Sequence, residues 1–408
     1  MYATRRDSFQ RRYNRLQPFP MKLLHVIPSL SPASGGPAEA LRQLVRAYPR
    51  AGVSAEIVCL DAPGSGWLAS FAAPVHALDW RGGKYGRSPR LRQWLEQNVA
   101  RFDGVVAHAM WSYPAVAVRR AARGRVPYAV FTHGMLDPWF KRRYPLKHLK
   151  KRLYWPIQYP VLRDAKAVLF TSRLESELAP QSFRPNQWTS LVVPYGTNGA
   201  PPEEEAQRAA FEAILPQLAG RRFLLFLSRI HEKKGCDLLV EAFASVAAGQ
   251  PEVDLVIAGP DQTGLQASLM ARAEKLGVGG RVHWPGMLTG HAKWGVLRAC
   301  EVMVLPSHQE NFGVVVAEAL ACGRPALISD QVNIWREIKE SGAGLVEPDT
   351  LEGTRSLLTR WFALSGPERA AMSERALPAF AAQFSMRNCA LALRDLFNNF
   401  DSLSQEAP

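Results

Sequence analysis

Residues 306–325 read PSHQENFGVVVAEALACGRP, and this stretch joins a loop, a glycine turn and a helix. The apolar run 302–305 predicts a buried strand just before it, and a helix is expected over Val314–Cys322. Glu310 therefore lies in the loop after the strand, whereas Glu318 lies about one turn inside the helix. Strand, loop and helix in this order form the repeating unit of doubly wound parallel sheets.

The same alternation of strand and helix extends over most of the chain. Short apolar runs predict buried parallel strands, and amphipathic stretches predict helices between them. The sequence therefore predicts an α/β protein with two Rossmann-like, doubly wound parallel-sheet domains that face each other across a cleft. The predicted strands are 22–27, 56–60, 104–108, 128–132, 167–170, 191–194, 223–227, 254–258, 282–284, 302–305, 326–328 and 344–346. The predicted helices are 38–51, 91–101, 115–123, 238–248, 265–276, 314–322 and 386–400.

With 408 residues, the chain is long enough for two domains that each bury a core. A polar, proline-containing connector near 196–205 separates them. The N-terminal domain is expected over 21–198 and the C-terminal domain over 199–385. A helix and tail, 386–408, follow, and they could cross back to the N-terminal domain. Residues 1–20 are rich in arginine but lack the apolar centre of a signal peptide, so we interpret them as a disordered extension or the product of an upstream start codon.

Bulk composition excludes several classes of protein. Five scattered cysteines without a C-x-x-C pair predict a reduced, cytoplasmic protein with neither disulfides nor a zinc site. No apolar run reaches the roughly 18–20 residues that cross a bilayer, so an integral membrane protein is not expected. The net charge of +14 is uneven, since residues 1–200 hold 30 of the 50 Lys and Arg but only 11 of the 36 Asp and Glu. A basic half favours an anionic partner, but no nucleic-acid-binding signature accompanies it, so nucleic acid is not expected.

A second unusual cluster, RIHEKKG at 229–235, follows the strand predicted over 223–227. Arg229 and Lys234 supply cations that could hold a diphosphate, whose negative charge grows as it leaves. Many sugar transferases hold a divalent metal with a D-x-D motif for this purpose, and the chain contains no D-x-D. We therefore expect the two side chains to replace a metal. The alternative is an exposed basic turn without a ligand.

The start of the helix in the first motif is suited to an anion, because its backbone N–H groups have no partner within the helix. A carboxylate beside bound phosphate would be repelled unless it had another task, and accepting hydrogen bonds from sugar hydroxyls is such a task. Glu310 and Glu318 are therefore candidate contacts for a nucleotide sugar. Alternatively, Glu310 complements the helix dipole and Glu318 is solvated. The candidate N–H donors belong to Asn311, Phe312, Gly313 and Val314.

The N-terminal half carries weaker candidates at the ends of its strands. Gly35 and Gly36 lie between the first strand and the first helix, where they could let the main chain approach a phosphate or a sugar, or form an ordinary turn. His133 ends the strand at 128–132 and could bind a sugar hydroxyl, orient an acceptor, or be a structural histidine. His108 and Trp111 end the neighbouring strand, and Trp111 could stack on a sugar or belong to the core.

Residues 139–163 contain eight Lys or Arg, six aromatic residues and no acid. Pro145 predicts the start of a helix and Pro156 its end, and three leucines share one face of it. A basic, amphipathic helix of this kind can lie on an anionic membrane surface. Alternatively, the leucines pack on the domain and only the basic face is solvated. The leucines are Leu146, Leu149 and Leu153.

Together these residues resemble the glycosyltransferases of family 4, which have the two-lobed GT-B fold. The resemblance rests on the E-x7-E pair Glu310 and Glu318, the R-x4-K pair Arg229 and Lys234, and the glycine pair after the first strand. It covers nearly the whole chain and is most specific over 223–348. It implies that 21–198 is the acceptor-side domain and 199–385 the nucleotide-sugar-binding domain.

The resemblance implies a role for each of these residues. Glu310 would bind the hydroxyls of the donor sugar and stabilise the reacting centre, and Glu318 would bind the ribose. Arg229 and Lys234 would hold the diphosphate, the glycine pair would contact the phosphate side of the donor, and His133 would contact the donor sugar. Members of the family retain the anomeric configuration and need no metal, so no cofactor is expected besides the nucleotide diphosphate-sugar itself.

The run THGMLDPW at 132–139 and the basic helix after it are similar to a branch of this family. That branch builds bacterial exopolysaccharide or O-antigen units on a lipid carrier, which implies a lipid-linked saccharide acceptor and peripheral contact with the inner face of the membrane through 139–163. Asn311 departs from the pattern, because a glycine is common there. A nucleotide-sugar epimerase and a catalytically silent nucleotide-sugar-binding subunit remain alternatives.

Overall fold

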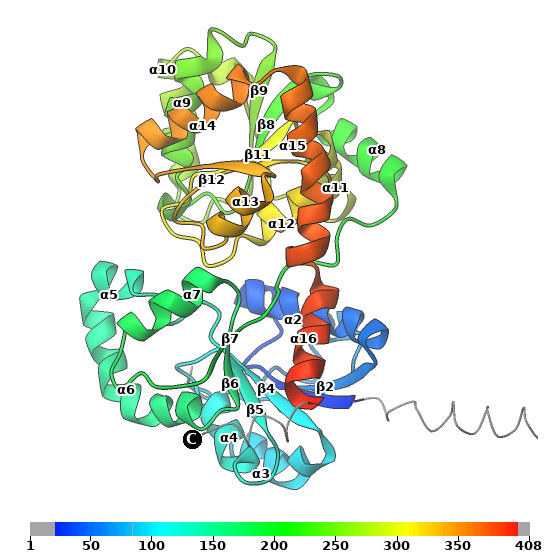
Figure 1. Ribbon diagram of the computed structural model, residues 1–408, viewed down its shortest axis with the longest axis vertical. Coiled ribbons are helices and arrows are strands. Elements are labelled where there is room, and N and C mark those ends of the chain that lie inside the picture. Colours follow the sequence, from blue (N-terminus) through cyan, green and yellow to red (C-terminus); the bar gives the residue numbers. More distant parts are fainter. Residues whose placement is uncertain (1–20, 84, 399–408) are drawn as a thin grey trace, which may run out of the picture. The chain divides into compact units, whose positions relative to one another are not determined.

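The structure, a computed structural model, describes residues 21–83 and 85–398, so the extension expected at 1–20 lies outside the described residues. The chain divides into two compact units, whose helices and strands are labelled in Figure 1. We call them the N-terminal unit and the C-terminal unit. Among the described residues, the N-terminal unit comprises 21–83, 85–170, 176–193 and 386–398, and the C-terminal unit comprises 171–175 and 194–385.

The N-terminal unit contains a seven-stranded parallel sheet in the order β3-β2-β1-β4-β5-β6-β7. Every residue of β4, β5 and β6 is buried, as expected for parallel strands covered on both faces. The sequence analysis missed β3, because this strand is only three half-buried residues long. The strands are β1 Met21–Val26, β2 Val53–Cys59, β3 Val75–Ala77, β4 Gly104–His108, β5 Tyr128–Phe131, β6 Ala167–Phe170 and β7 Ser190–Val192.

The last described helix, α16 (Met386–Asn398), belongs to the N-terminal unit, where it packs against α2 (Gly36–Ala47). Figure 1 shows α16 in red beside α2. The ring of Phe397 fills the space next to Gly104, where a Cβ would lie 2.4 Å from that ring. The other helices of this unit are α3 Pro89–Asn98, α4 Tyr113–Ala122, α5 Trp139–Arg143 and α6 Pro145–Arg163, and the residues of α7 Arg173–Leu178 are divided between the two units.

Helix α6 begins at Pro145 as predicted, but it does not end at Pro156. It continues through Pro156 and Pro160 to Arg163, although each internal proline gives up one backbone hydrogen bond. Burial of Trp155, Gln158, Val161 and Leu162 on one face of this second half explains why the helix persists. Among the helices of the described residues, none combines the length and the apolar content that a membrane span requires.

The C-terminal unit contains a six-stranded parallel sheet in the order β10-β9-β8-β11-β12-β13. The residues of β9, β11 and β12 are all buried. The strands are β8 Arg222–Leu227, β9 Val253–Ala258, β10 Val282–Gly286, β11 Val302–Leu305, β12 Ala326–Ser329 and β13 Gly344–Glu347. All six lie within two residues of the predicted runs at each end, because continuous apolar segments mark strands that are buried on both faces.

Helices surround this second sheet, and several of them escaped the sequence analysis. Helix α11 approaches α8 closely, since a Cβ on Gly295 would lie 2.0 Å from the carbonyl oxygen of Gln207. Residues 194–198 also lie in this unit, where Thr197 pairs with Ser385, so the boundary falls a few residues before the predicted one. The helices are α8 Glu204–Ile214, α9 Cys236–Ala247, α10 Leu265–Lys275, α11 Gly290–Ala299, α12 Val314–Ala321, α13 Trp335–Ser341, α14 Leu351–Ala363 and α15 Gly366–Ala379.

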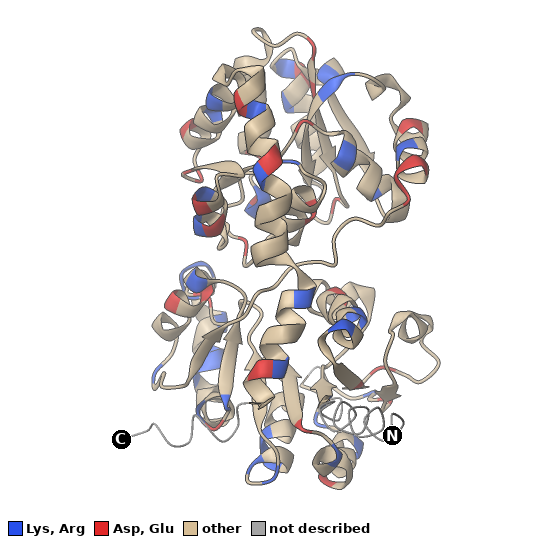
Figure 2. Ribbon diagram, turned by 45° about the vertical axis from the view of Figure 1, so that its right-hand side comes forward, with Lys and Arg blue, Asp and Glu red and all other residues tan. Residues whose placement is uncertain are grey.

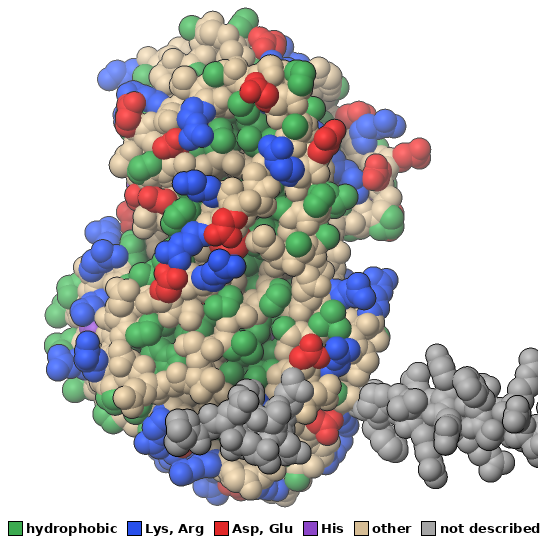
Figure 3. All heavy atoms as spheres, viewed as in Figure 1, with side chains coloured by type: hydrophobic (Ala, Val, Ile, Leu, Met, Phe, Trp, Pro, Cys, Tyr) green, Lys and Arg blue, Asp and Glu red, His purple; other side chains and the backbone are tan. Residues whose placement is uncertain are grey.

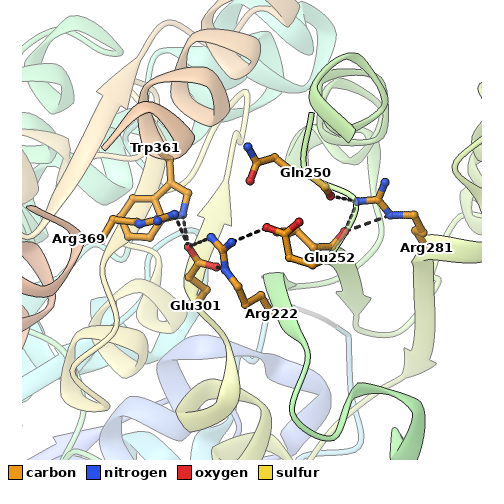
Figure 4. A network of polar contacts seen from close by, with 8 residues as sticks. Arg222, Gln250, Glu252, Arg281, Glu301, Trp361 and Arg369 are labelled. Carbon is orange, nitrogen blue, oxygen red and sulfur yellow. Dashed lines mark hydrogen bonds and ion pairs between the residues drawn. The ribbon is translucent and has the colours of Figure 1, made fainter. Parts of the chain in front are cut away.

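Charged residues of both signs are interspersed over the C-terminal unit (Figure 2), and one group of them closes the amino end of its sheet. Glu301, just before β11, accepts hydrogen bonds from Arg222 at 2.8 and 2.9 Å, from the Trp361 indole at 3.0 Å and from Arg369 at 3.2 Å. Arg222 also reaches Glu252 at 2.6 Å (Figure 4). We call this group the amino-end network. It ties β8 and β11 to α14 and α15.

Candidate functional site

The opposite, carboxyl end of the same sheet carries the first sequence motif. The loop after β11 is held by its backbone, since the N–H of Glu310 donates to the carbonyl of Gln331 at 3.0 Å and the Glu310 carbonyl accepts from the N–H of Asn333 at 3.0 Å. Glu310 thereby pairs with Val332 as an isolated parallel bridge. This fixed main chain sets the direction of the half-buried Glu310 side chain.

Lys234 comes from the loop after β8, yet its ammonium group contacts the carboxylate of Glu310. Lys234 is buried and lies at the end of the short turn Glu232–Lys234. Gly235 follows with φ +65°, and a Cβ there would lie 2.1 Å from the carbonyl oxygen of Pro306. Only glycine lets the two loops approach this closely. The cation and the carboxylate singled out in the sequence therefore meet at one point.

Arg229, the other predicted cation, lies apart from this contact. Its side chain is exposed and donates to Gln262 at 3.0 Å. Within the described part of the chain it forms no ion pair with an acidic side chain. Its positive charge is therefore available to an anionic ligand, although solvent weakens the field of an exposed cation.

Glu318 is buried inside α12 rather than solvated, so the alternative in which it faces water is wrong. Its carboxylate accepts a hydrogen bond from Lys293 of α11 at 2.7 Å. Helix α12 begins at Val314, and the preceding Gly313, with φ +78°, provides no side-chain cap for the first N–H groups. These groups suit an anion or an ordered water.

Three buried polar atoms lack a hydrogen-bond partner among the described residues: Asn311 Oδ1, Ser307 Oγ and Asn333 Nδ2. Asn311 and Ser307 are close to Glu310 in the sequence, and the backbone N–H of Asn333 donates to the Glu310 carbonyl. The amide nitrogen of Asn311 does have a partner, since it donates to the Thr171 hydroxyl at 3.3 Å. Leaving such an atom unsatisfied costs about 1–3 kcal/mol, so each is expected to bind water or a ligand. The sequence analysis singled out Asn311, for its backbone N–H and as a departure from the family pattern, but missed the other two. Ser307 lay within the quoted motif, but nothing in the sequence singled out Asn333.

Gly35 and Gly36 form the exposed entry to α2 in the N-terminal unit. Gly35 has φ +79°, a conformation that strongly favours glycine, and a Cβ built on either residue would meet nothing within 4 Å. The first N–H groups of α2 have no side-chain cap. The main chain can therefore be approached here, as the sequence suggested.

The ends of β4 and β5 hold unusual backbone conformations. Ala109 (φ +70°) and Trp111 (φ +63°) follow β4, and His133 (φ +48°) follows β5. Non-glycine residues rarely adopt positive φ, and such strain clusters at functional sites. Three of these residues on neighbouring strand ends mark this edge of the N-terminal sheet as a second candidate region.

His133 belongs to a chain of hydrogen-bonded rings. Its Nε2 lies 3.1 Å from Nδ1 of His108, whose Nε2 lies 2.8 Å from Nδ1 of His25. Nε2 of His25 in turn lies 2.7 Å from the Tyr48 hydroxyl. We call these four residues the ring chain. His25 and Tyr48 were not among the predicted candidates, because a single histidine in an apolar strand gives no sign of its neighbours.

The ring chain is uncharged near neutral pH. Burial lowers the pKa of His25 to about 3 and that of His133 to about 4. Burial, together with the neighbouring His25 and His133, also lowers the pKa of His108 well below its usual value. The carboxyl end of the C-terminal sheet thus presents charges, whereas this end of the N-terminal sheet presents neutral hydrogen-bonding rings.

Helix α6 carries the predicted leucine face, but the leucines do not pack on the domain. Leu146 is 78% and Leu153 76% exposed, and Leu149 and Ile157 are exposed as well. The alternative of a helix that buries its leucines is therefore wrong. Figure 3 shows apolar and basic side chains together at the edge where α5 and α6 lie in Figure 1. We call this the α6 surface.

Comparisons with known proteins agree with this architecture. Residues 35–196 match the family described as "Glycosyl transferase 4-like domain", and residues 208–377 match "Glycosyl transferases group 1". A D-inositol 3-phosphate glycosyltransferase of Segniliparus rotundus is 33% identical over 186 residues, which make up 44% of this chain and 40% of that protein. The chain thus matches less than half the length of this curated relative.

Two solved structures share the fold. Anabaena Alr3699/HepE in complex with UDP and glucose superposes with a TM-score of 0.70 at 18% identity, covering 93% of this chain and 100% of the other. WaaG, a glycosyltransferase involved in lipopolysaccharide biosynthesis, superposes with a TM-score of 0.63 at 17% identity, covering 92% and 99%.

Proposed function

The chain belongs to the glycosyltransferases of family 4, with the GT-B fold, and we propose that it transfers a sugar from a nucleotide diphosphate-sugar to a hydroxyl group. The observation that carries this proposal is the contact between Lys234 and Glu310 at the carboxyl end of the C-terminal sheet. Ligands of open α/β sheets bind at this end of the strands.

In the proposed reaction, Lys234 and Arg229 stabilise the diphosphate as it departs. The bond between the anomeric carbon and the phosphate oxygen breaks, and the acceptor oxygen bonds to the same face, so the configuration is retained. The departing phosphate oxygen takes the proton of the acceptor hydroxyl. Fixed cations lower the barrier because they are already placed where negative charge develops.

The two carboxylates would recognise hydroxyl groups of the donor. Glu310 is the proposed partner of the sugar and of the reacting centre, and Glu318 that of the ribose. Each carboxylate already contacts a lysine, Lys234 or Lys293, so neither is an uncompensated charge before the donor binds. Asn311, Phe312, Gly313 and Val314 would offer backbone N–H groups to the phosphates. In the N-terminal unit, Gly35, Gly36 and His133 are the proposed contacts to the donor.

We further propose that the reaction needs no divalent metal. The sequence lacks a D-x-D motif, and in residues 21–83 and 85–398 no three His, Cys, Asp or Glu side chains gather as a metal site. Turnover should therefore persist in excess EDTA. Loss of turnover in EDTA, restored by Mg²⁺ or Mn²⁺, would show that a metal takes the role assigned to the two cations.

For the acceptor, we propose a lipid-linked saccharide presented at an anionic membrane. The α6 surface supports this, because its exposed leucines are flanked by basic residues and 139–163 contains no acid. Such a helix binds a membrane by burying its apolar side chains and by attraction to anionic lipid. WaaG, which shares the fold, is involved in lipopolysaccharide biosynthesis.

The name of the curated relative favours a second candidate acceptor, D-inositol 3-phosphate. Both acceptors can be tested in one assay that measures release of the nucleoside diphosphate. UDP-, GDP- and ADP-sugars are first screened by thermal shift, because a bound donor raises the melting temperature. The stabilising donor is then incubated with each acceptor and without one.

Release of the nucleoside diphosphate that depends on the lipid-linked saccharide supports the full proposal, whereas dependence on the inositol phosphate replaces the acceptor. Conversion of the donor without any acceptor would indicate an epimerase. Binding without turnover in any mixture would indicate a non-catalytic subunit.

The membrane contact has its own test with vesicles of phosphatidylglycerol and phosphatidylcholine. Replacing both Leu146 and Leu153 by Ser should weaken cosedimentation with the vesicles at least tenfold, because about 0.8 kcal/mol is lost for each CH₂ no longer buried in lipid. Leu377→Ser, at an exposed leucine of the C-terminal unit, is the matched control. Equal binding by both variants would remove α6 from the interface.

A further inference from the structure

Helix α6 has a second face, opposite its exposed leucines, that carries cations and lines a cavity. Lys147, His148 and Lys151 lie three or four positions apart, so they share one face of the helix. Together with Phe140 and Tyr144 they line a cavity of about 60 Å³ in the N-terminal unit, which we call the α6 cavity. By the same measure one water molecule needs about 10–15 Å³, so the cavity has room for a phosphoryl group.

The charge of Lys151 is not balanced by an acid. Its Nζ lies 4.7 Å from the ring centroid of Trp111 and 5.6 Å from that of Phe140, and no carboxylate among the described residues forms an ion pair with it. Burial, and then the neighbouring Lys147, lower the pKa of this half-buried ammonium group. An anion in the cavity would therefore stabilise the charged form of Lys151.

The rest of the lining adds more donors than acceptors. Nζ of Lys147 lies 4.6 Å from the ring centroid of Tyr144, and no described residue hydrogen-bonds to the ring nitrogens of His148. Asp137 is the one acid among the described residues of the lining, and its carboxylate accepts a hydrogen bond from the backbone N–H of Trp139 at 2.8 Å. Two lysines against one carboxylate leave the α6 cavity with an excess of positive charge.

The place of the α6 cavity indicates which anion it suits. Lys151 contacts the ring of Trp111, which belongs to the second candidate region after β4 and β5. Leu146 and Leu153 of the α6 surface are exposed on the other side of the helix. A helix with its side chains is about 10–12 Å across, so the cavity lies about one helix diameter from the leucines that would meet the membrane. In a saccharide joined to a lipid through phosphate, the phosphate is the group next to the lipid.

We propose that the α6 cavity binds the phosphoryl group that joins the acceptor saccharide to its lipid, with Lys151 as the main cation and Lys147 and His148 as further donors. This inference rests on the proposed function, because it takes the acceptor to be a lipid-linked saccharide. It adds that the acceptor must carry a phosphate. The phosphates of the donor belong to a different place, since their proposed partners are Arg229 and Lys234.

Geranyl diphosphate is a suitable probe, because it is a soluble compound with a diphosphate on a short apolar chain. Isothermal titration calorimetry with the full-length protein in about 0.15 M salt measures its affinity while attraction to distant surface charges is screened. We expect it to bind at least tenfold more tightly than geraniol, which lacks the phosphates. Absence of binding, or equal affinity for geraniol, would overturn the proposal.

A matched pair of substitutions on α6 locates the probe. Lys151→Met removes the charge but keeps an apolar chain against the aromatic rings, and it should weaken binding at least tenfold. Lys150→Met is the control, because Lys150 is an exposed lysine of the same helix that lies outside the lining, and it should change the affinity less than twofold. Equal losses in both variants would mean that the helix attracts the probe only through its overall charge.

Two further variants keep the test decisive. Lys151→Arg retains a cation and should bind the probe within about threefold of the wild type, which shows whether charge or folding is lost in Lys151→Met. Arg229→Gln should leave the affinity for the probe unchanged. A loss of binding in Arg229→Gln but not in Lys151→Met would place the probe at the donor site and refute the inference.

Membrane lipids also carry phosphate, and cosedimentation with the phosphatidylglycerol vesicles separates this source from the acceptor. Lys150→Met and Lys151→Met each remove one charge, so we expect them to bind the vesicles equally. Weaker binding by Lys151→Met would assign the cavity to a phospholipid head group instead. If no donor supported sugar transfer, the proposed function would fail, while the calorimetric titrations would still decide whether the α6 cavity binds phosphate.

Discussion

The two ends of the C-terminal sheet use the same kinds of side chain for different purposes. At the amino end, the Glu301 carboxylate accepts hydrogen bonds from Arg222, Arg369 and the Trp361 indole (Figure 4). At the carboxyl end, Glu310 contacts Lys234, and nearby polar atoms within the described residues lack partners. A group of charges whose hydrogen-bond partners all belong to the protein adds stability, whereas one beside polar atoms without partners is available to a ligand.

The largest effect is expected at the incomplete end. Glu310→Gln keeps the size of the side chain but removes the charge that faces Lys234 and the proposed sugar. We expect kcat to fall about 10²- to 10³-fold, as when a preorganised transition-state contact is lost. Initial rates at saturating donor, at a temperature where both proteins are folded, measure this, and calorimetry measures separately the stability lost because buried Lys234 loses its charged partner. Full activity would remove Glu310 from the mechanism.

Glu301→Gln is the matched substitution at the amino end, and it should lower stability without lowering kcat. Arg222 and Arg369 would lose their shared carboxylate, which we expect to lower the free energy of unfolding by about 2–3 kcal/mol. For a unit of this size the melting temperature should fall by about 4–12 °C, with kcat unchanged. A fall in kcat at constant stability would show that Glu301 has a catalytic and not a stabilising role.

Lowering the pH should destabilise the N-terminal unit, because its buried histidine rings are neutral in the folded state. Since the pKa of His25 is lowered to about 3 in the folded state, the unfolded state binds more protons between that value and about 6.5. The free energy of unfolding is therefore highest above pH 6.5 and decreases as the pH falls. His25 alone should lower it by about 2 kcal/mol between pH 7 and pH 5.

Urea unfolding at the two pH values measures this loss. His25→Gln removes the titrating group, so the variant should depend less on pH even if it is less stable at pH 7. The same pH dependence in both proteins would show that His25 does not contribute.

The smallest effect is expected for Arg229, which is exposed and therefore screened by solvent. Arg229→Gln should raise the KM for the donor about tenfold or less, and added salt should reduce the difference. Measuring KM at low and at high ionic strength checks both statements. An effect as large as that of Glu310→Gln would mean that Arg229 is desolvated when the donor binds.

The sequence was informative where one local pattern determines the outcome. Continuous apolar runs located every strand of both sheets except the short β3, and the loops after β8 and β11 met because neighbouring parallel strands bring their carboxyl ends together. The meeting of Lys234 and Glu310 could therefore be expected from topology alone.

Other features depend on packing between distant segments and had no local signal. Tyr48, His25 and His108 join through hydrogen bonds that span 23 and 83 positions of the chain. Helix α6 continues past Pro156 because its second half is buried, a tertiary effect that overrides the proline. The orphan nitrogen of Asn333 also escaped notice, because only the folded state shows that it lacks a partner among the described residues.

The return of the chain to the N-terminal unit has a consequence for biosynthesis. Leu393 and Phe397 of α16 are buried in a unit whose other segments end at Val193, so translation must proceed through the whole C-terminal unit before they emerge from the ribosome. Until then the nascent N-terminal unit exposes the apolar surface that α16 will cover, including the space beside Gly104. The C-terminal unit is thus synthesised while the N-terminal unit still lacks α16. During this interval chaperones would bind the exposed apolar surface.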